Sequence, residues 1–273
     1  MADTFTNALS RVRLDKSTLV LSTAVLGTAL ILPSIYRDYR TFRNYGPGGL
    51  PNNVIGWLTC RALLQPFKRE MFSTEEYVKR VEAAEGHGKG DEGFLELSPE
   101  QLASRSAADR PIVGPHVVPQ RQLTQIPEEE VMEKLRAAFS AFGYRNHHLV
   151  KVERSNLEKH SDALFLADHL PATDLAQTMQ GEIAHIHSCH DHSIHVVCSP
   201  ADLSGIKIIE AGWGQRHGFS GTSAMTYLSL GTVPDFPSEY ILIYAPRTEA
   251  DIKTVMDIIA AGVKFMTGRE DTR

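Results

Sequence analysis

The stretch that decides the fold is EIAHIHSCHDHSIHVVC, residues 182–198, which holds five of the protein's 12 histidines. On either side of a central polar run, apolar side chains alternate with polar ones, at Ala184, Ile186, Ile194 and Val196. This period of two is typical of a strand with one buried face, and a polar run between two such segments is typical of a turn. The sequence therefore predicts a β-hairpin.

The length of the turn decides which histidines meet, because residues opposite each other in an antiparallel pair share a face. A turn at 189–191, with or without one residue on each side, places His185 opposite His195 and His187 opposite Ser193. One face is then apolar and the other carries three histidines. A two-residue turn would mix the faces, so we expect the odd-length turn. Ordinary surface or hydrogen-bonded histidines are the alternative, but three on one face favour proton transfer or metal ligation.

Composition limits the class of protein. The chain has 273 residues, of which 42% are hydrophobic and 22% charged, as is ordinary for a protein with a folded core. The net charge of -5 offers no basic surface, so no nucleic-acid partner is expected. Cys60, Cys189 and Cys198 show no CxxC spacing, which argues against a thiolate zinc site and against a disulfide scaffold.

The segment from Leu19 to Ile35 contains no charged residue and, with its neighbours, reaches the ~20 residues that cross a membrane as a helix. A cleaved signal peptide is the alternative, but its apolar run is usually only about 7–15 residues and is followed by a small-residue cleavage site. Basic residues flank both ends, so the orientation stays open. We expect residues 1–45 to form a single-pass membrane anchor that ends in a basic segment, Arg37 to Arg43.

Residues 46–110 are predicted to be a helical segment followed by a flexible linker. The glycines and prolines of Gly46 to Pro51 interrupt the preceding helix. Val54 to Phe67 is apolar but too short to span a membrane, so we expect a helix at the membrane interface or packed on a core. Residues 86–93 are rich in glycine and charge, and the connection to about residue 110 is expected to be flexible.

Residues 111–273 are predicted to form the main domain. Besides the hairpin, helices are expected at 127–143, 199–212 and 248–265, and strands at 149–152, 163–167 and 239–245. Four strands before the second helix argue for the α+β class, with an antiparallel sheet that contains the histidine-bearing hairpin and is packed by two to three helices. The chain contains no P-loop and no GxGxxG motif, which disfavours nucleotide-dependent chemistry.

A second unusual cluster is GWGQRH, residues 212–217, expected as a loop just beyond the second helix. Trp213 offers a flat ring for stacking, Arg216 a planar cation for an oxyanion, and His217 a base. The plainer interpretation is a glycine cap followed by a packed tryptophan and solvated charges. Polar side chains of the extended segment 111–125 are also predicted to bind substrate, namely His116, Arg121 and Gln122.

Taken together, these motifs resemble the fungal luciferases and the larger luciferase-domain family of fungi. The resemblance is carried by EIAHIHSCHDHSIHV, GWGQRH and YILIYAPRTEADIKTVMDIIAAGVKFMTG. It extends upstream through IYRDYRTF, YGPGGLPNNVIGWL and PQRQLTQ, and so covers most of the chain. It implies a membrane-associated enzyme whose catalytic part is residues 111–273, and it suggests an internal membrane such as the endoplasmic reticulum.

The resemblance also implies a chemistry. The luminescent members oxidise 3-hydroxyhispidin, a styryl hydroxypyrone, with O2 and need no recognised metal or organic cofactor, whereas many relatives belong to fungi that do not glow. We therefore expect a cofactor-independent oxygenase that acts on an enolisable hydroxypyrone or polyketide-type substrate. In this hypothesis His185 or His187 is the base with His195 as its neighbour, and Asp191 orients a histidine or shapes the turn. Arg216 holds the enolate, Trp213 stacks on the ring, and His217 is a second acid/base.

Three alternatives use the same residues differently. His185, His187 and His195 could bind a divalent metal, because three imidazoles with an open position match catalytic metal sites. The domain could instead be an oxygen-independent isomerase, lyase or hydrolase that acts on a polyketide-like metabolite. It could also be a membrane-tethered binding protein for a small apolar molecule. The expected partners are a small-molecule substrate and a membrane, and the oligomeric state stays open.

Overall fold

The computed structural model describes residues 16–85, 93–203, 207–221, 223, 226–227 and 235–273. Two compact units are present, residues 1–44 and residues 45–273. Ile206 of the second predicted helix, most of the predicted 86–93 loop and the basic residues before Lys16 lie outside the described residues.

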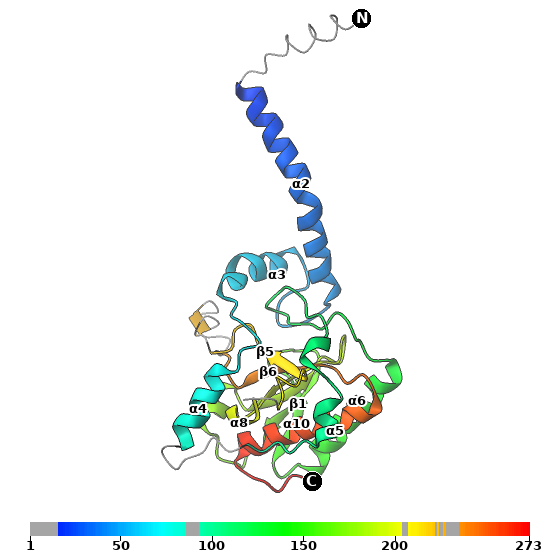
Figure 1. Ribbon diagram of the computed structural model, residues 1–273, viewed down its shortest axis with the longest axis vertical. Helices are drawn as coiled ribbons and strands as arrows, with labels where there is room; N and C mark the ends of the chain where they lie inside the picture. The colour runs from blue at the N-terminus through cyan, green and yellow to red at the C-terminus, as the bar shows by residue number, and fades with distance from the viewer. Residues whose placement is uncertain (1–15, 86–92, 204–206, 222, 224–225, 228–234) are drawn as a thin grey trace, which may run out of the picture. The chain divides into compact units, whose positions relative to one another are not determined.

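The first unit contains one long helix, α2 (Lys16–Asn44), with Pro33 inside it (Figure 1). Within the described residues, α2 is the helix long and apolar enough to cross a membrane, with its candidate span at Leu19–Asn44. A signal sequence would pass the same test of length and composition. The basic segment Arg37 to Arg43 continues the apolar helix rather than forming a helix of its own.

The second unit is built on a six-stranded antiparallel sheet with the order β1-β2-β3-β4-β6-β5. Its strands are β1 (Val150–Arg154), β2 (Asp162–Leu166), β3 (Glu182–Ile186), β4 (Ile194–Val197), β5 (Gly214–Arg216) and β6 (Tyr240–Ile243). The predicted hairpin is β3–β4, and its predicted register is confirmed, with His185 opposite His195 and Ile186 opposite Ile194. The α+β class with an antiparallel sheet is therefore correct.

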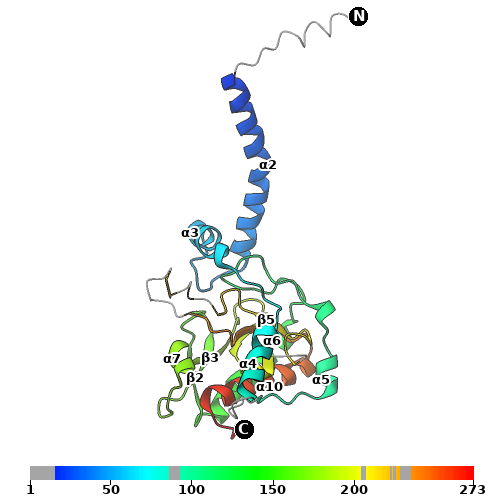
Figure 2. The same ribbon diagram turned by 60° about the vertical axis from the view of Figure 1, so that its left-hand side comes forward.

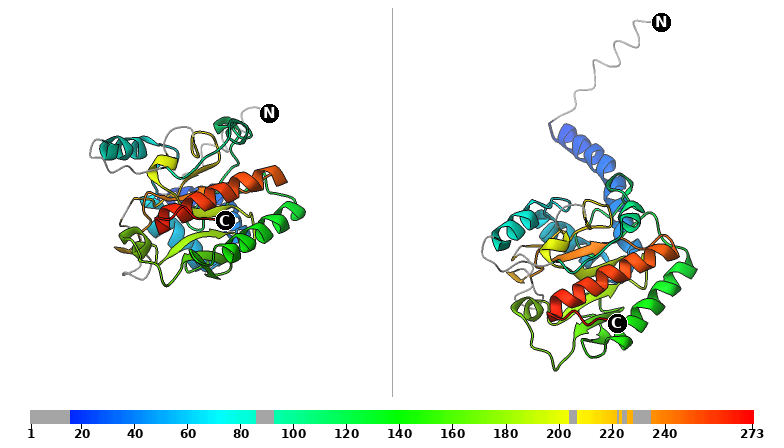
Figure 3. Two further views of the ribbon diagram at one scale, coloured as in Figure 1. Left: turned by 90° about the horizontal axis from the view of Figure 1, so that it is seen from below. Right: turned by 60° about the horizontal axis from the view of Figure 1, so that its bottom comes forward.

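Helices α6 (Glu129–Arg145) and α10 (Glu249–Thr267) cover one face of this sheet and pack against each other (Figure 3). The fit is close at two glycines. A Cβ on Gly143 would lie 2.4 Å from Val152 Cγ2, and a Cβ on Gly262 would lie 2.6 Å from the carbonyl oxygen of Val197. Gly143, expected to end α6, therefore lies inside the helix, where it lets α6 approach the sheet.

Shorter elements complete the second unit. They are α3 (Val54–Leu58), the π-helix η1 (Thr59–Leu64), the 3-10 helix η2 (Gln65–Phe67), α4 (Glu75–Glu85), α5 (Pro99–Ala103), the 3-10 helix η3 (Ala107–Asp109), α7 (Asp174–Thr178) and α8 (Pro200–Leu203). Figure 2 shows α7 beside β2 and β3, which it connects. The predicted boundaries of the segment 46–110 stay predictions. Its described part lies in the same compact unit as the sheet, and Arg105 is buried there.

Two expectations about the strands need correction. The arms of the hairpin were expected to have one exposed face, but every residue of β3 and β4 is buried, because loops cover the histidine face as the helices cover the apolar one. Residues 214–216 were expected in a loop, but they form the edge strand β5, paired with β6. This three-residue strand lacks the apolar alternation that would have revealed it.

Candidate functional site

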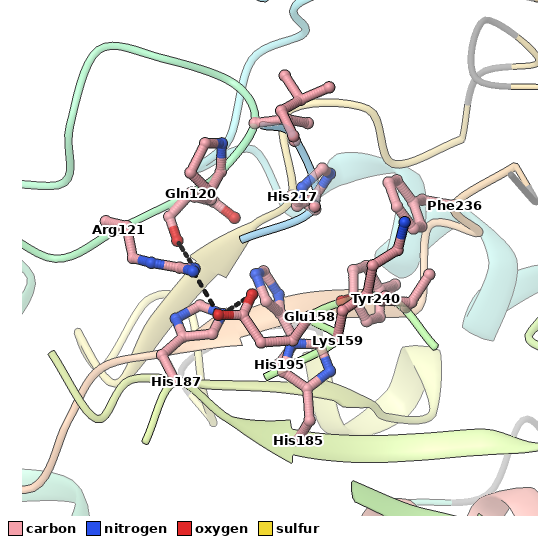
Figure 4. A pocket seen from close by; sticks show the side chains of 15 residues that line it. Gln120, Arg121, Glu158, Lys159, His185, His187, His195, His217, Phe236 and Tyr240 are labelled. Carbon is pink, nitrogen blue, oxygen red and sulfur yellow. Dashed lines mark hydrogen bonds and ion pairs between the residues drawn. The ribbon is translucent and has the colours of Figure 1, made fainter. Parts of the chain in front are cut away.

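A pocket opens on the histidine face of the sheet (Figure 4). Its volume is about 120 Å³, roughly ten times what a single water molecule requires, so it has room for a small ligand. The side chains that matter most to its chemistry are those of Gln120, Arg121, Glu158, Lys159, His185, His187, His195, His217, Phe236 and Tyr240. Four of the histidines singled out from the sequence therefore share one pocket.

Three of these histidines form a triangle, His185, His187 and His195, called here the histidine triad. Their ring centroids lie 5.4 Å apart for His185–His187, 5.4 Å for His185–His195 and 5.0 Å for His187–His195. One ring nitrogen from each lies within 4.8 Å of the other two. The fourth, His217, has its ring centroid 5.3 Å from that of His195.

The orientation of His185 depends on an irregularity in β3. Leu164 pairs with Ala184 and the next residue of β2, Phe165, pairs with Glu182, so Ile183 is an extra residue in the ladder. A bulge of this kind changes the face toward which the preceding side chain points. Glu182 consequently lies on the histidine face, where its Oε1 is 2.6 Å from Nδ1 of His185.

The Glu182 carboxylate also organises the loop between β1 and β2. It accepts hydrogen bonds from Ser155 Oγ at 2.7 Å and from the amide of Asn156 at 2.8 Å. Burial works against the charge, but the hydrogen bonds from His185 and Ser155 outweigh it and lower the pKa of Glu182. Glu182 is therefore a carboxylate at neutral pH, and it accepts the Nδ1–H of His185.

His187 is oriented by a relay from the turn of the hairpin. Ser193 Oγ donates to Asp191 Oδ1 at 2.6 Å and lies 2.9 Å from Nδ1 of His187. Since its hydroxyl proton is used on Asp191, Ser193 accepts the proton of His187 Nδ1. Burial opposes ionisation of Asp191, but hydrogen bonds from His187 and Ser193 lower its pKa to about 2. Asp191 thus both shapes the turn and orients a histidine.

His195 and His217 carry their protons on different nitrogens. Nδ1 of His195 lies 3.1 Å from the carbonyl oxygen of Ile241, which can only accept, so His195 has its proton on Nδ1. Nδ1 of His217 accepts the amide hydrogen of Phe219 at 3.2 Å, so neutral His217 has its proton on Nε2. We therefore assign three Nε2 lone pairs to the triad and one Nε2–H donor to His217.

The charge of these rings follows from burial. Burial is the largest cause that lowers the pKa of His187, and the nearby charge of Arg121 adds to it. The pKa of His195 is lowered further by burial and by its histidine neighbours, and that of His217 falls to about 3. These three rings are neutral at pH 7, so their lone pairs are available to a proton or a cation.

A buried ion pair borders the triad. Arg121 Nη2 lies 2.5 Å from Oε1 of Glu158, and the other oxygen of Glu158 lies 4.0 Å from Nε2 of His187. Burial raises the pKa of Glu158, but the charges of His187 and Arg121 lower it by more. Glu158 comes from the loop between β1 and β2, so this loop places a carboxylate beside the triad (Figure 4).

An aromatic wall faces the pocket. Tyr240 stacks on His195 with ring centroids 4.7 Å apart, and Phe236 stacks on Tyr240 at 4.9 Å. His217 meets Phe236 edge to face at 4.6 Å. These flat, largely apolar surfaces favour a planar ligand.

The described residues that line the pocket do not include four of the predicted site residues. His116 binds the hydroxyl of Tyr45 through Nδ1 at 2.9 Å. Gln122 accepts from the amide of Ala245 at 3.0 Å and donates to the carbonyl groups of residues 124 and 125. Both side chains hold the segment 111–125 in place, and their contact with substrate stays a prediction.

Trp213 and Arg216 do not line the pocket, and the geometry of the sheet explains the position of Arg216. Trp213 is buried under Arg105, whose guanidinium carbon is 4.7 Å from the ring centroid. Arg216 pairs with Ile241 on the helix-covered face of the sheet and binds Glu76 at 2.6 Å. Because successive side chains of a strand point to opposite faces, Arg216 and His217 cannot both face the pocket.

Other functional candidates went unnoticed in the sequence, chiefly Glu158, Glu182, Phe236 and Tyr240. Simple alternation along the strand assigns Glu182 to the apolar face, and only the bulge at Ile183 turns its side chain to the histidine face. Glu158 lies in an ordinary polar loop, and no pattern in the sequence sets it apart. Tyr240 belongs to the strongest predicted strand, where an alternation count could have placed it on the face of Leu242 and hence of His195.

Comparisons with known proteins identify the family to which the chain is similar. The family model described as the luciferase domain matches residues 180–262, which include the triad and His217. The protein named luciferase from Armillaria ostoyae is 30% identical over 252 residues, which is 89% of this chain and 85% of that protein. The luciferase from Neonothopanus nambi is 28% identical over 263 residues, 93% of this chain and 89% of that protein. No solved structure matches the chain.

Proposed function

Because the chain belongs to the luciferase-domain family that includes the fungal luciferases, we propose that it is an oxygenase that adds O2 to an enolisable hydroxypyrone or polyketide-type molecule. The observation that carries the proposal is the convergence of four buried histidines of assigned tautomer on one pocket. Three nitrogens there can accept a proton or a cation and one can donate, which is what oxidation of an enol requires.

The reaction begins at the enol oxygen. An enol is oxidised by O2 much more readily as its enolate, so the proton must leave this oxygen. In the route predicted from the sequence, the proton passes to Nε2 of His185 or His187, and Glu182 stabilises the imidazolium of His185 as a carboxylate stabilises a catalytic histidine. In the alternative route, the triad would hold a divalent cation, which would supply Lewis-acid stabilisation of the enolate oxygen.

Both routes give the same product. The enolate carbon and O2 form a carbon–oxygen bond, the electron pair comes from the enolate, and the released proton ends on the outer oxygen of a hydroperoxide. His217 Nε2–H can hydrogen-bond the developing oxygen anion, and the stack of Phe236 and Tyr240 supports a planar ring. The buried walls keep water from the intermediate.

Oxygen uptake with product mass analysis tests the proposal. Full-length protein in detergent is mixed with 3-hydroxyhispidin and related hydroxypyrones under ¹⁸O2, and one O2 should be consumed for each substrate, with label in the product. His187→Ala should lose turnover and keep its circular dichroism spectrum. His190→Ala, in the same hairpin but not among the triad, is the matched control. Substrate change without O2 uptake would favour an isomerase, lyase or hydrolase, and stoichiometric binding without product would favour a binding protein.

We also propose that the protein is attached to a membrane through α2. The helix is long and apolar enough for this, and the short helical run at 54–67 exposes apolar side chains, including Ile55 at 66% and Leu63 at 54%. Such a run can lie in a membrane interface, and only nine residues of sequence separate it from the end of α2. Location in the endoplasmic reticulum stays a prediction.

A further inference from the structure

We propose that His185, His187 and His195 bind one divalent transition-metal ion through their Nε2 atoms. From the sequence, a site without a metal is expected and this ion is the alternative, whereas the surroundings of the three rings favour the ion. Only the use of the ion rests on the proposed oxygenase function; its binding does not.

Each ring of the triad makes a hydrogen bond through Nδ1, on the side away from the proposed ion. Nδ1 of His185 binds a carboxylate, Nδ1 of His187 binds a serine that is itself bound to a carboxylate, and Nδ1 of His195 binds a backbone carbonyl. Metal-binding histidines nearly always donate their second ring N–H to such an acceptor, which fixes the tautomer and turns the other nitrogen toward the ion. Here all three rings meet that condition at once, although they come from both arms of the hairpin and depend on three different acceptors.

The three rings also lie close enough together for one ion to reach all of them. Three ligand atoms within 4.8 Å of one another leave a position about 2.8 Å or less from each of them. A metal–imidazole bond measures about 2.1 Å, so shifts of about 0.7 Å in each side chain complete the site. Shifts of this size need only small rotations of the side chains, without any change in the register that puts His185 opposite His195.

The charge around the triad also favours a bound cation. Among the described residues, four buried charged side chains surround the triad: the carboxylates of Glu158, Glu182 and Asp191, and the guanidinium of Arg121. Three negative charges and one positive charge leave a net charge of about −2 in a region shielded from water, which is costly unless it is compensated. One divalent cation on the triad balances this charge. Lys159, which also lines the pocket, is exposed and reaches solvent.

The donor set indicates the kind of ion. Neutral imidazole nitrogens suit zinc, iron, copper and nickel, whereas magnesium and calcium prefer oxygen ligands. Three protein ligands leave open positions for substrate or water, as in catalytic rather than structural sites. Glu158, with one oxygen 4.0 Å from Nε2 of His187, can approach as a further ligand or balance the charge. Bound there, the ion would lower the pKa of an enol placed against it.

Metal content tests the proposal without any activity measurement. Full-length protein is produced with a tag that contains no histidine, purified in detergent, and analysed for transition metals by mass spectrometry. Wild type should carry close to one ion per chain. His187→Ala and His195→Ala should carry less than about a tenth of that, and Glu158→Gln should bind the ion about 10–100-fold more weakly. His190→Ala should retain the full content.

Cobalt gives a second readout that does not depend on which variants fold. After the wild-type protein has been stripped with a chelator, adding Co²⁺ should produce visible absorption bands that saturate at one equivalent and raise the unfolding temperature. Absence of any bound transition metal in the purified protein, together with no cobalt bands, would overturn the proposal. Oxygen uptake by the stripped protein would then still support the proposed oxygenase through its histidine-base route, so the two proposals fail separately.

Discussion

The substitution Glu182→Gln most directly tests the hydrogen-bond network assigned to the site. The side chain keeps its size but loses its charge, and one of its two acceptor oxygens becomes an NH2 donor. At present Oε1 serves Ser155 and His185, whereas Oε2 serves the amides of Asn156 and Leu157. Whichever way the new amide turns, two donors lose their acceptor.

The expected loss of stability is about 3 kcal/mol. A buried donor left without its acceptor costs about 1–3 kcal/mol, and two are affected, while removal of the desolvation cost of the carboxylate offsets part of the loss. For a unit of this size, 1 kcal/mol corresponds to roughly 2–4 °C, so the unfolding temperature should fall by about 6–12 °C at pH 7. The pKa of Glu182 is lowered in the folded protein, so its contribution is present above pH ~4.3 and is lost as the pH falls through the folded value.

The variant should also weaken the site itself. An amide that donates to Nδ1 of His185 would move that ring's proton to Nε2 and remove one of the three lone pairs. The affinity for metal, or the turnover rate, should therefore drop about 10–100-fold, which is more than the loss of stability alone would cause. Thermal unfolding of the full chain in detergent and metal analysis give the two readouts, with the exposed Glu153→Gln as control. A fall of less than about 2 °C would refute the assigned network.

Three further predictions concern other parts of the chain. Burial lowers the pKa of His217 to about 3, so the free energy of unfolding should fall as the pH drops below ~6.5. In urea unfolding, His217→Gln should lose about 2 kcal/mol less than the wild type between pH 7 and pH 5. An equal loss in the two proteins would contradict the burial of His217. Gly262→Ala should destabilise by about 1–3 kcal/mol, because its Cβ would meet Val197 at 2.6 Å, and an unchanged unfolding temperature would show that α10 can move away from the sheet. The double substitution Leu26→Arg and Leu30→Arg should release the protein from membranes in carbonate extraction, because each charge raises the free energy of membrane insertion by about 2.5–3.5 kcal/mol. N-terminal sequencing that finds a mature chain starting after the apolar part of α2 would identify a signal sequence instead.

The hairpin could be predicted from the sequence because its pattern constrains the register twice. Ala184 and Ile186 on one arm, and Ile194 and Val196 on the other, must share the helix-covered face, and one odd-length turn satisfies both arms. Once that register is fixed, the meeting of the histidines follows without any knowledge of the site. The same reasoning did not reveal that both faces are buried, because burial of the polar face depends on segments distant in sequence.

The surroundings of the triad could not be predicted, because they depend on departures from the simple pattern. Alternation assigns Glu182 to the apolar face, and only the bulge at Ile183 brings it behind His185. Glu158 reaches the pocket from a loop, where periodicity carries no information. Arg216 was expected beside His217, but once residues 214–216 form a strand, their alternation separates the two side chains.

The same two strands supply both the core and the site, and this shared origin explains why the site can tolerate so much buried polarity. Ala184, Ile186, Ile194 and Val196 lie buried on the face that α10 covers, while the opposite face of the hairpin buries three histidines, two of them in β3 and β4 and His187 directly after β3. Burial of apolar area on one side stabilises the backbone that must hold polar side chains in fixed positions on the other. Substitutions that loosen the core should therefore first displace the three Nε2 atoms from their fixed positions. The close approach at Gly262 accordingly bears on the chemistry, although it lies on the far side of the sheet.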